Sequence, residues 1–125
     1  MKQHLVNEGK NMARILIIDD HPVALRLLRH VLEKTNHTVR SEIGAEAALS
    51  TFDEFKPNMV ITDQNMPGMC GDELTRILKE KYPGLLIIIL SSSEVPASHK
   101  ADIVIDKAQS SEELQRAVKK LLTLR

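Results

Sequence analysis

The chain has 125 residues, of which 42% are hydrophobic and 27% charged, a balance typical of a single globular domain. Its 17 Lys and Arg residues match 17 Asp and Glu residues, so the net charge gives no general attraction to nucleic acid or to an acidic membrane. Two Phe, one Tyr and no Trp argue against a base-stacking surface, and the single cysteine excludes an internal disulfide.

The N-terminal residues 1–13 are predicted to form a flexible arm, followed by one domain at residues 14–125. The arm lacks the apolar centre of a secretory signal, and no apolar run in the chain approaches the roughly 20 residues needed to cross a bilayer. We therefore expect a cytoplasmic protein that binds no membrane and, by itself, no nucleic acid.

The first predicted strand, residues 14–18, is an apolar run that ends in the acidic pair Asp19 and Asp20, as expected for a buried strand of a parallel sheet. Residues 22–34 then show helical spacing, with Pro22 in the first turn, where its missing N–H has no cost. The apolar residues expected on the inner side of this helix are Val23, Leu27, Leu28, Val31 and Leu32.

The middle of the chain continues the alternation of strands and helices. One strand ends in another acid, Asp63, and the loop after it contains one Pro and two Gly. Asp72 is predicted to cap the helix that follows this loop. The predicted elements here are a strand at 38–42, a helix at 45–55, a strand at 59–63, a loop at 65–71 and a helix that runs to about residue 81.

The last third begins with six consecutive apolar residues at 85–90, which predict a central buried strand that ends at Ser91. After an irregular segment, residues 103–105 predict a short strand that is followed by Asp106 and Lys107. The final helix is expected to start with a cap at Ser110 or Ser111 and to pack through Leu114, Ala117, Val118, Leu121 and Leu122.

Strands that alternate with helices predict a doubly wound parallel sheet, in which ligands bind at the carboxyl ends of the strands. Three carboxylates gathered at this edge repel one another, and a hard cation such as Mg²⁺ relieves the repulsion through oxygen ligands. A carboxylate beside Mg²⁺ can attack phosphorus while a lysine and a hydroxyl hold the phosphoryl oxygens. The sequence therefore predicts a phosphoryl-transfer site formed by Asp19, Asp20, Asp63, Ser91 and Lys107.

With these residues the chain resembles the receiver domain of bacterial two-component response regulators over nearly all of residues 14–125. Residues 63–71 are similar to the phosphoacceptor loop of the family, Asp-x-x-Met-Pro-x-x-x-Gly, while Ser91 and Lys107 stand at its switch hydroxyl and its last-strand lysine. The resemblance implies a flavodoxin-like, doubly wound α/β fold with a five-stranded parallel sheet in the order 2-1-3-4-5.

The resemblance also implies a role for each residue of the site. Asp63 would accept a phosphoryl group from a phosphohistidine on a sensor histidine kinase or a phosphotransfer protein. Asp20, Asp63 and the backbone carbonyl of Asn65 would bind Mg²⁺ directly, and Asp19 would act mainly through a metal-bound water. The serine would bind a phosphoryl oxygen, and the lysine would pair with the phosphoryl group or, before phosphorylation, with the acceptor aspartate.

Three departures from the family pattern affect the predicted output. Ala108 follows Lys107 where the family usually has Pro, and Val104 stands where the family has its switch aromatic. The chain between Ser91 and Lys107 is also shorter than the family norm, so the fourth helix is expected to be short or irregular. We hypothesise that the domain takes up phosphate but signals through an atypical surface.

Two alternative functions stay open at this point. The departures at Val104 and Ala108 keep open a phosphorylation-independent protein-interaction module. An aspartyl-nucleophile phosphatase is the other, although such enzymes usually place a second acid where this chain has Asn65. In the leading interpretation the chain is no enzyme beyond its own phosphorylation and dephosphorylation. Its expected partners are a kinase, a downstream protein or an effector domain outside this chain, and a second copy of itself.

Overall fold

The computed structural model describes residues 12–124, so the first 11 residues of the predicted arm at 1–13 lie outside the described part of the chain. Ala13, which the sequence placed in the arm, is buried in the core. Its N–H donates to Nδ1 of His37 at 3.0 Å, and its carbonyl accepts from the N–H of Thr38 at 2.9 Å. The domain therefore begins at Ala13 or earlier, at least one residue before the predicted boundary.

A five-stranded sheet forms the centre of the domain, with every neighbouring pair parallel and the order β2-β1-β3-β4-β5. This confirms the predicted fold class and strand order. The apolar runs occupy the three inner strands, where both faces of the sheet are covered by helices. The strands are β1 (Arg14–Ile18), β2 (Thr38–Glu42), β3 (Met59–Asp63), β4 (Leu86–Ser91) and β5 (Ile103–Asp106).

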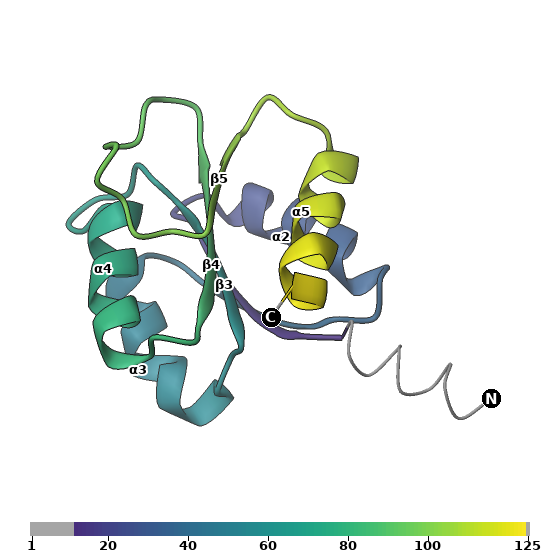
Figure 1. Ribbon diagram of the computed structural model, residues 1–125, viewed down its shortest axis with the longest axis horizontal. Coiled ribbons are helices and arrows are strands. Elements are labelled where there is room, and N and C mark those ends of the chain that lie inside the picture. The colour runs from purple at the N-terminus through teal and green to yellow at the C-terminus, as the bar shows by residue number, and fades with distance from the viewer. Residues whose placement is uncertain (1–11, 125) are drawn as a thin grey trace.

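Within residues 12–124, four helices cover the two faces of the sheet. One pair packs on one face through a core cluster that includes Leu25, Leu32 and Leu114, and the other pair packs on the opposite face around Phe52 and Leu74. Figure 1 shows the two pairs on either side of the sheet. The first pair is α2 (Pro22–Glu33) and α5 (Ser111–Leu124), and the second is α3 (Ala45–Phe55) and α4 (Gly71–Lys81). In the described part of the chain, no helix combines the length and apolarity needed to cross a membrane.

The predicted inner face of α2 is partly wrong. Val23 and Leu27 are 60% and 65% exposed, whereas Leu25 and Leu32 are buried. The helix carries two overlapping apolar stripes with helical spacing, and the sheet can bury only one of them. Helical periodicity alone does not tell which stripe faces the sheet.

The chain between β4 and β5, residues 92–102, contains turns and bends but no helix, as the sequence predicted for this region. We call it the connecting segment. Its last residue, Asp102, accepts from the N–H of Ile87 and from Nζ of Lys79, both at 2.8 Å, and its own N–H donates to the Ile87 carbonyl at 2.8 Å. These contacts hold the end of the connecting segment against β4 and α4.

The start of α4 differs from the prediction, because Cys70 is the N-cap residue and Asp72 lies in the first turn. Gly71 is the first residue of the helix, and its N–H donates to the Gln64 carbonyl at 2.9 Å. A Cβ on Gly71 would overlap the backbone carbonyl oxygen of Asp63. Only glycine therefore allows α4 to begin this close to the end of β3.

We expect Gly71→Ala to lower the free energy of unfolding by about 1–3 kcal/mol, because the added methyl group forces the backbone of α4 and β3 apart. Denaturant titration followed by circular dichroism measures this change. Gly84→Ala is the matched control, since a Cβ there meets no atom within 4 Å, and its effect should stay within about 0.5 kcal/mol. Equal effects of the two substitutions would contradict the steric argument.

Candidate functional site

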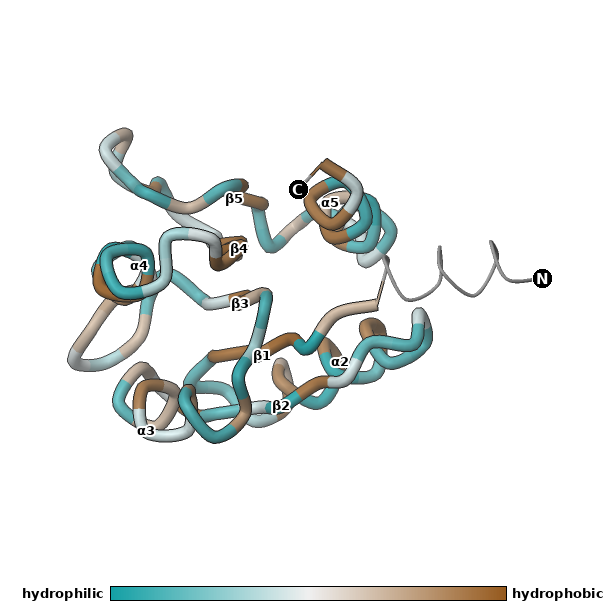
Figure 2. The backbone as a smooth tube through the Cα atoms, turned by 60° about the horizontal axis from the view of Figure 1, so that its bottom comes forward, coloured by the Kyte–Doolittle hydropathy of each residue, from teal (hydrophilic) through white to brown (hydrophobic). Residues whose placement is uncertain are grey.

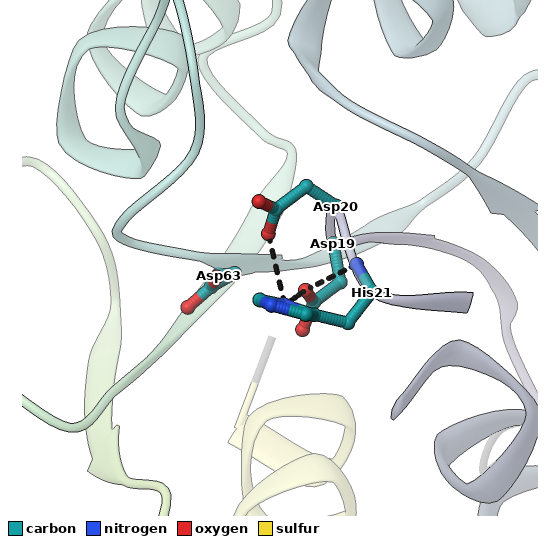
Figure 3. A group of neighbouring side chains, drawn as sticks. All are labelled: Asp19, Asp20, His21 and Asp63. Carbon is teal, nitrogen blue, oxygen red and sulfur yellow. Dashed lines mark hydrogen bonds and ion pairs between the residues drawn. The ribbon is translucent and has the colours of Figure 1, made fainter. Parts of the chain in front are cut away.

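Three carboxylates meet at the carboxyl ends of neighbouring strands, as the sequence predicted. Asp19 and Asp20 follow β1, and Asp63 is the last residue of β3, which pairs directly with β1. Each of these three side chains and His21 offers one ligand atom, and these four atoms lie within 4.8 Å of one another. Figure 3 shows the carboxyl groups of Asp19, Asp20 and Asp63 gathered around the imidazole of His21.

Lys107 provides a positive charge at this cluster. Its Nζ lies 2.9 Å from Oδ1 of Asp63 and 3.3 Å from Oδ2 of Asp19. Burial disfavours the charged lysine, but the hydrogen bond to Asp63 and the charge of Asp19 outweigh it and raise the pKa of Lys107. Burial likewise disfavours ionised Asp19, but its hydrogen bonds from His21 and the charge of Lys107 lower the pKa of Asp19 overall.

His21 lies over the acidic pair as a second basic group. Its Nδ1 is 3.1 Å from Oδ1 of both Asp19 and Asp20, and its backbone N–H donates to Asp19 at 3.0 Å. The hydrogen bond to Asp19 and the charge of Asp20 raise the pKa of the imidazole. The side chain of His21 is largely exposed.

The donor set of the cluster fits a hard divalent cation. Oδ1 of Asp20 is buried and, within residues 12–124, accepts no hydrogen bond of good geometry, although His21 Nδ1 lies 3.1 Å away. A buried, unsatisfied carboxylate oxygen is costly without a positive charge to bind. Mg²⁺ prefers such oxygen ligands from one or two carboxylates and leaves room for water and phosphoryl oxygens. The residues present therefore fit the predicted magnesium site.

Ser91 lies at the same edge but its hydroxyl is engaged elsewhere. The hydroxyl donates to the Ser93 carbonyl at 2.7 Å and accepts from the Ser93 N–H at 3.1 Å. The backbone of Ser91 is fixed, because its carbonyl accepts from the N–H of Lys107 at 2.9 Å. Asn65 follows Asp63 by two residues, and its side-chain amide donates to Oγ of Ser93 at 2.9 Å.

Two residues that the sequence analysis missed shape the surroundings of Asp63. One is Ser93, which the sequence marks only as the third serine of the run at 91–93. Gln64 is the other: it is buried, donates to the Asp72 carboxylate at 2.8 Å and accepts from the Asp72 N–H at 2.9 Å. Cys70 also donates to this carboxylate, and that hydrogen bond raises the pKa of its thiol, so Cys70 is a poor nucleophile at neutral pH.

Comparison with known proteins gives a family match over residues 15–119, to the response regulator receiver domain. A stretch of 73 residues is 42% identical to the virulence sensor protein BvgS of Bordetella pertussis and covers 57% of this chain but 6% of BvgS. A stretch of 81 residues is 32% identical to the DNA-binding transcriptional activator EvgA of Escherichia coli and covers 63% of this chain and 40% of EvgA. The chain thus corresponds to only part of each relative.

Solved structures agree with the family match. The response regulator TrrA of Thermotoga maritima, in complex with Mg²⁺ and BeF, is 31% identical and superimposes with a TM-score of 0.80, covering 86% of this chain and 97% of TrrA. The signal receiver domain of a histidine kinase from Syntrophus aciditrophicus is 28% identical with a TM-score of 0.82, covering 89% of this chain and 90% of that domain.

We expect Lys107→Ala to lower the free energy of unfolding at pH 7, in EDTA, by about 1–3 kcal/mol, because it leaves Asp19 and Asp63 without their cation. This expected loss of stability is smaller than the loss for a fully buried ion pair, because the lysine is partly exposed. Lys100→Ala removes an exposed lysine that makes no ion pair within residues 12–124, and it should change stability little.

The same substitution has a predicted pH dependence. Since the pKa of Asp19 lies below its ordinary value of 3.8, the ionised form contributes to stability above that pH, and the contribution is lost as the pH falls through the lower value of the folded state. The stability difference between the wild type and Lys107→Ala should therefore shrink below about pH 4. Urea titrations across this range measure it, and a difference independent of pH would contradict the electrostatic origin.

Proposed function

The chain belongs to the response regulator receiver domain family, and on this premise we propose that it is a phosphoacceptor signalling domain of a two-component system. Asp63 would receive a phosphoryl group, with Mg²⁺ bound, from a phosphohistidine on a sensor histidine kinase or a phosphotransfer protein. The phosphorylated domain would then change the partner that it binds. Such a switch is a two-state equilibrium that a local charge shifts.

One observation carries the proposal: the Asp63 carboxylate is buried at the end of β3, is paired with Lys107 at 2.9 Å, and lies beside two further acids. An aspartate with only a structural role would need no charged neighbour besides the lysine that pairs with it. The second and third carboxylates add repulsion that serves no packing purpose, and a bound cation with a phosphoryl group would make use of all of them.

We propose that Asp19, Asp20 and Asp63, with the backbone carbonyl of Asn65, hold Mg²⁺, which when bound would neutralise charge on the phosphoryl oxygens. A carboxylate oxygen of Asp63 would form the new O–P bond as the N–P bond of the donor breaks and the imidazole leaves with its electron pair. Lys107 would shift its ion pair from Asp63 to a phosphoryl oxygen. Ser91 would turn its hydroxyl from Ser93 toward another of these oxygens.

Neither alternative function is favoured by a specific observation. A phosphatase of the aspartyl-nucleophile type needs an acid near the nucleophile to move a proton, and the residue at that place, Asn65, has an amide side chain that donates to Ser93. A binding module that is never phosphorylated would not need a lysine paired with two acids and a third acid beside them. We therefore propose no metabolic substrate for this domain, whose family is the response regulator receiver domain.

The partial coverage of the relatives supports a proposal for the partners on the output side. EvgA is a DNA-binding activator and BvgS a sensor protein, and this chain matches 40% and 6% of their lengths. We propose that this domain likewise acts on a downstream protein or on an effector domain outside the chain, with a second copy of the chain as a further candidate. We also propose that the domain is cytoplasmic, as the sequence predicted.

Acetyl phosphate with Mg²⁺ should add one phosphoryl group to the wild-type protein, seen by intact-protein mass spectrometry. Asp63→Asn should abolish the adduct, because an amide cannot act as the nucleophile. Asp106→Asn is the matched control: it removes another strand-end acid that lies outside the carboxylate cluster, and the adduct should form as in the wild type.

A second readout separates metal binding from phosphorylation. Mg²⁺ should raise the melting temperature of the wild type and should do so much less in Asp20→Asn, because ligand binding to the folded state stabilises it. An Asp63→Asn protein that still gains a phosphoryl group would refute Asp63 as acceptor. Absence of an adduct from both acetyl phosphate and a phosphohistidine donor protein, while Mg²⁺ still binds, would refute the phosphoacceptor function.

A further inference from the structure

We propose that Gln64 is a positioning residue for the cation of the phosphoryl site: its side chain, paired with Asp72, closes the loop between β3 and α4 (residues 64–70) and fixes the backbone carbonyl of Asn65 before Mg²⁺ binds. The inference rests on the proposed function, because that carbonyl is a proposed ligand of Mg²⁺. It adds to the site a residue that acts through the loop rather than through contact with the cation.

The amide side chain of Gln64 forms a reciprocal pair with Asp72, which lies in the first turn of α4. Its Nε2 donates to Oδ1 of the carboxylate at 2.8 Å, and its Oε1 accepts from the backbone N–H of the same residue at 2.9 Å. The backbone of Gln64 is bonded as well: its carbonyl accepts from the N–H of Gly71 at 2.9 Å, and its N–H donates to the carbonyl of Leu90 at 3.1 Å. Gln64 therefore ties β4 to the start of α4 directly after Asp63.

The burial of Gln64 indicates that this pair does more than fill space. Gln64 is 6% exposed, and a buried amide is costly unless its donors and acceptors are satisfied. A side chain needed only for packing would be apolar, because it would have no polar group to satisfy. An amide and a carboxylate in a reciprocal pair instead fix the distance and the orientation of both residues.

Asp72 is well suited to hold the loop. Hydrogen bonds from Cys70 and Gln64 lower the pKa of its carboxyl group, so the group is ionised at neutral pH and accepts both as charge-assisted hydrogen bonds. Its place in the first turn of α4 is also the end of a helix at which a negative charge is favourable. Both ends of the loop, residues 64 and 70, are thus fastened to one carboxylate.

The loop closed in this way carries the carbonyl that would bind Mg²⁺. Asn65 directly follows Gln64, whose backbone N–H and carbonyl are both hydrogen-bonded, so the chain is held up to the residue before that carbonyl. The backbone of α4 lies against the carbonyl of Asp63, where only glycine fits at position 71, and the pair keeps it there. A ligand already in place binds a cation without the loss of conformational entropy that a free loop would suffer.

A plain helix cap is the alternative explanation of the same contacts. Oε1 of Gln64 accepts from an N–H in the first turn of α4, and the loss of such a cap lowers the stability of the folded domain. It would not change the affinity of the folded domain for Mg²⁺. The Mg²⁺ affinity therefore distinguishes the two roles, whereas stability alone does not.

The first test measures the dissociation constant of Mg²⁺ by NMR titration of the whole chain, with melting temperatures in EDTA alongside. Gln64→Met keeps a side chain of similar size without its hydrogen bonds, and Mg²⁺ should bind roughly tenfold more weakly, the factor for ordering about one residue of backbone. Gln115→Met is the matched control: it removes a hydrogen bond to the Val31 carbonyl, outside the site, and should lower the melting temperature without changing the Mg²⁺ affinity.

Gln64→Glu combined with Asp72→Asn is the rescue variant. It exchanges the amide and the carboxylate, so the side chain at position 72 donates to the one at position 64, and the backbone N–H at position 72 keeps its acceptor. The charge of the pair is unchanged, and the Mg²⁺ affinity should return to within about twofold of the wild type.

The rate of phosphorylation by acetyl phosphate gives an independent readout of the same variants. Gln64→Met should need roughly tenfold more Mg²⁺ to reach half of its maximal rate, because only the binding of the cation is weakened. At saturating Mg²⁺ it should react at the wild-type rate. A lower rate at saturating Mg²⁺ with an unchanged half-saturating concentration would overturn the inference.

The second test uses the wild type alone and follows amide hydrogen exchange by NMR in EDTA and in Mg²⁺. The N–H groups of Gly71 and Asp72, which donate to Gln64, should already be protected in EDTA and should gain little protection with Mg²⁺. Protection that appears only with Mg²⁺ would mean that the cation orders the loop. That result would overturn the inference even if Gln64→Met does not fold.

The outcomes separate this inference from the function beneath it. If Gln64→Met and the wild type bind Mg²⁺ equally, or if the rescue variant binds it as weakly as Gln64→Met, the positioning role is overturned and the phosphoacceptor function stands. If the wild type takes up no phosphoryl group while the Mg²⁺ affinities follow the expected pattern, the positioning role stands and the phosphoacceptor function falls. If the wild type binds no Mg²⁺, both are overturned.

Discussion

Mutual repulsion of three carboxylates at the ends of two paired strands is the constraint on which the rest of this domain depends. Asp19, Asp20 and Asp63 are brought together by backbone pairing of β1 with β3, which the chain cannot relax without losing its central strands. Lys107, which directly follows β5, offsets part of the repulsion, although β3 and β4 lie between β5 and β1 in the sheet. Within the described residues a buried oxygen of Asp20 has no hydrogen-bond partner, which is costly for a carboxylate without a bound cation.

The topology explains why these residues and no others meet. In a doubly wound sheet the strand order reverses beside the first strand, and the loops there diverge to opposite faces and leave an open crevice. β1 and β3 flank that point, while β4 and β5 bring Ser91 and Lys107 to the same edge. The close start of α4 on Gly71 then fixes the backbone directly after Asp63. The position of each site residue is therefore set by the pairing of the strands and by the loops that connect them to the helices.

Much of this could be predicted from the sequence because apolar runs locate buried strands and acids directly after them locate one edge of the sheet. The strand order came from the family resemblance, since alternation alone fits several orders. Other features depend on three-dimensional contacts that no local pattern contains. The sheet beneath α2 determines which of its two apolar stripes is buried. Val23 and Leu27 have helical spacing, but they lie on the exposed side of the helix. Gln64 and Ser93 matter through loop geometry that brings distant residues into contact.

The departures from the family pattern have a common physical meaning. An aromatic side chain can transmit motion because it is large and has two preferred positions, whereas Val104 is small and held in a strand. A segment held by hydrogen bonds at two points can transmit motion differently, since loss of one bond changes its freedom while the other keeps its place. Asn65 and Asp102 hold the connecting segment in this way, one at the charged site and one at α4 and β4.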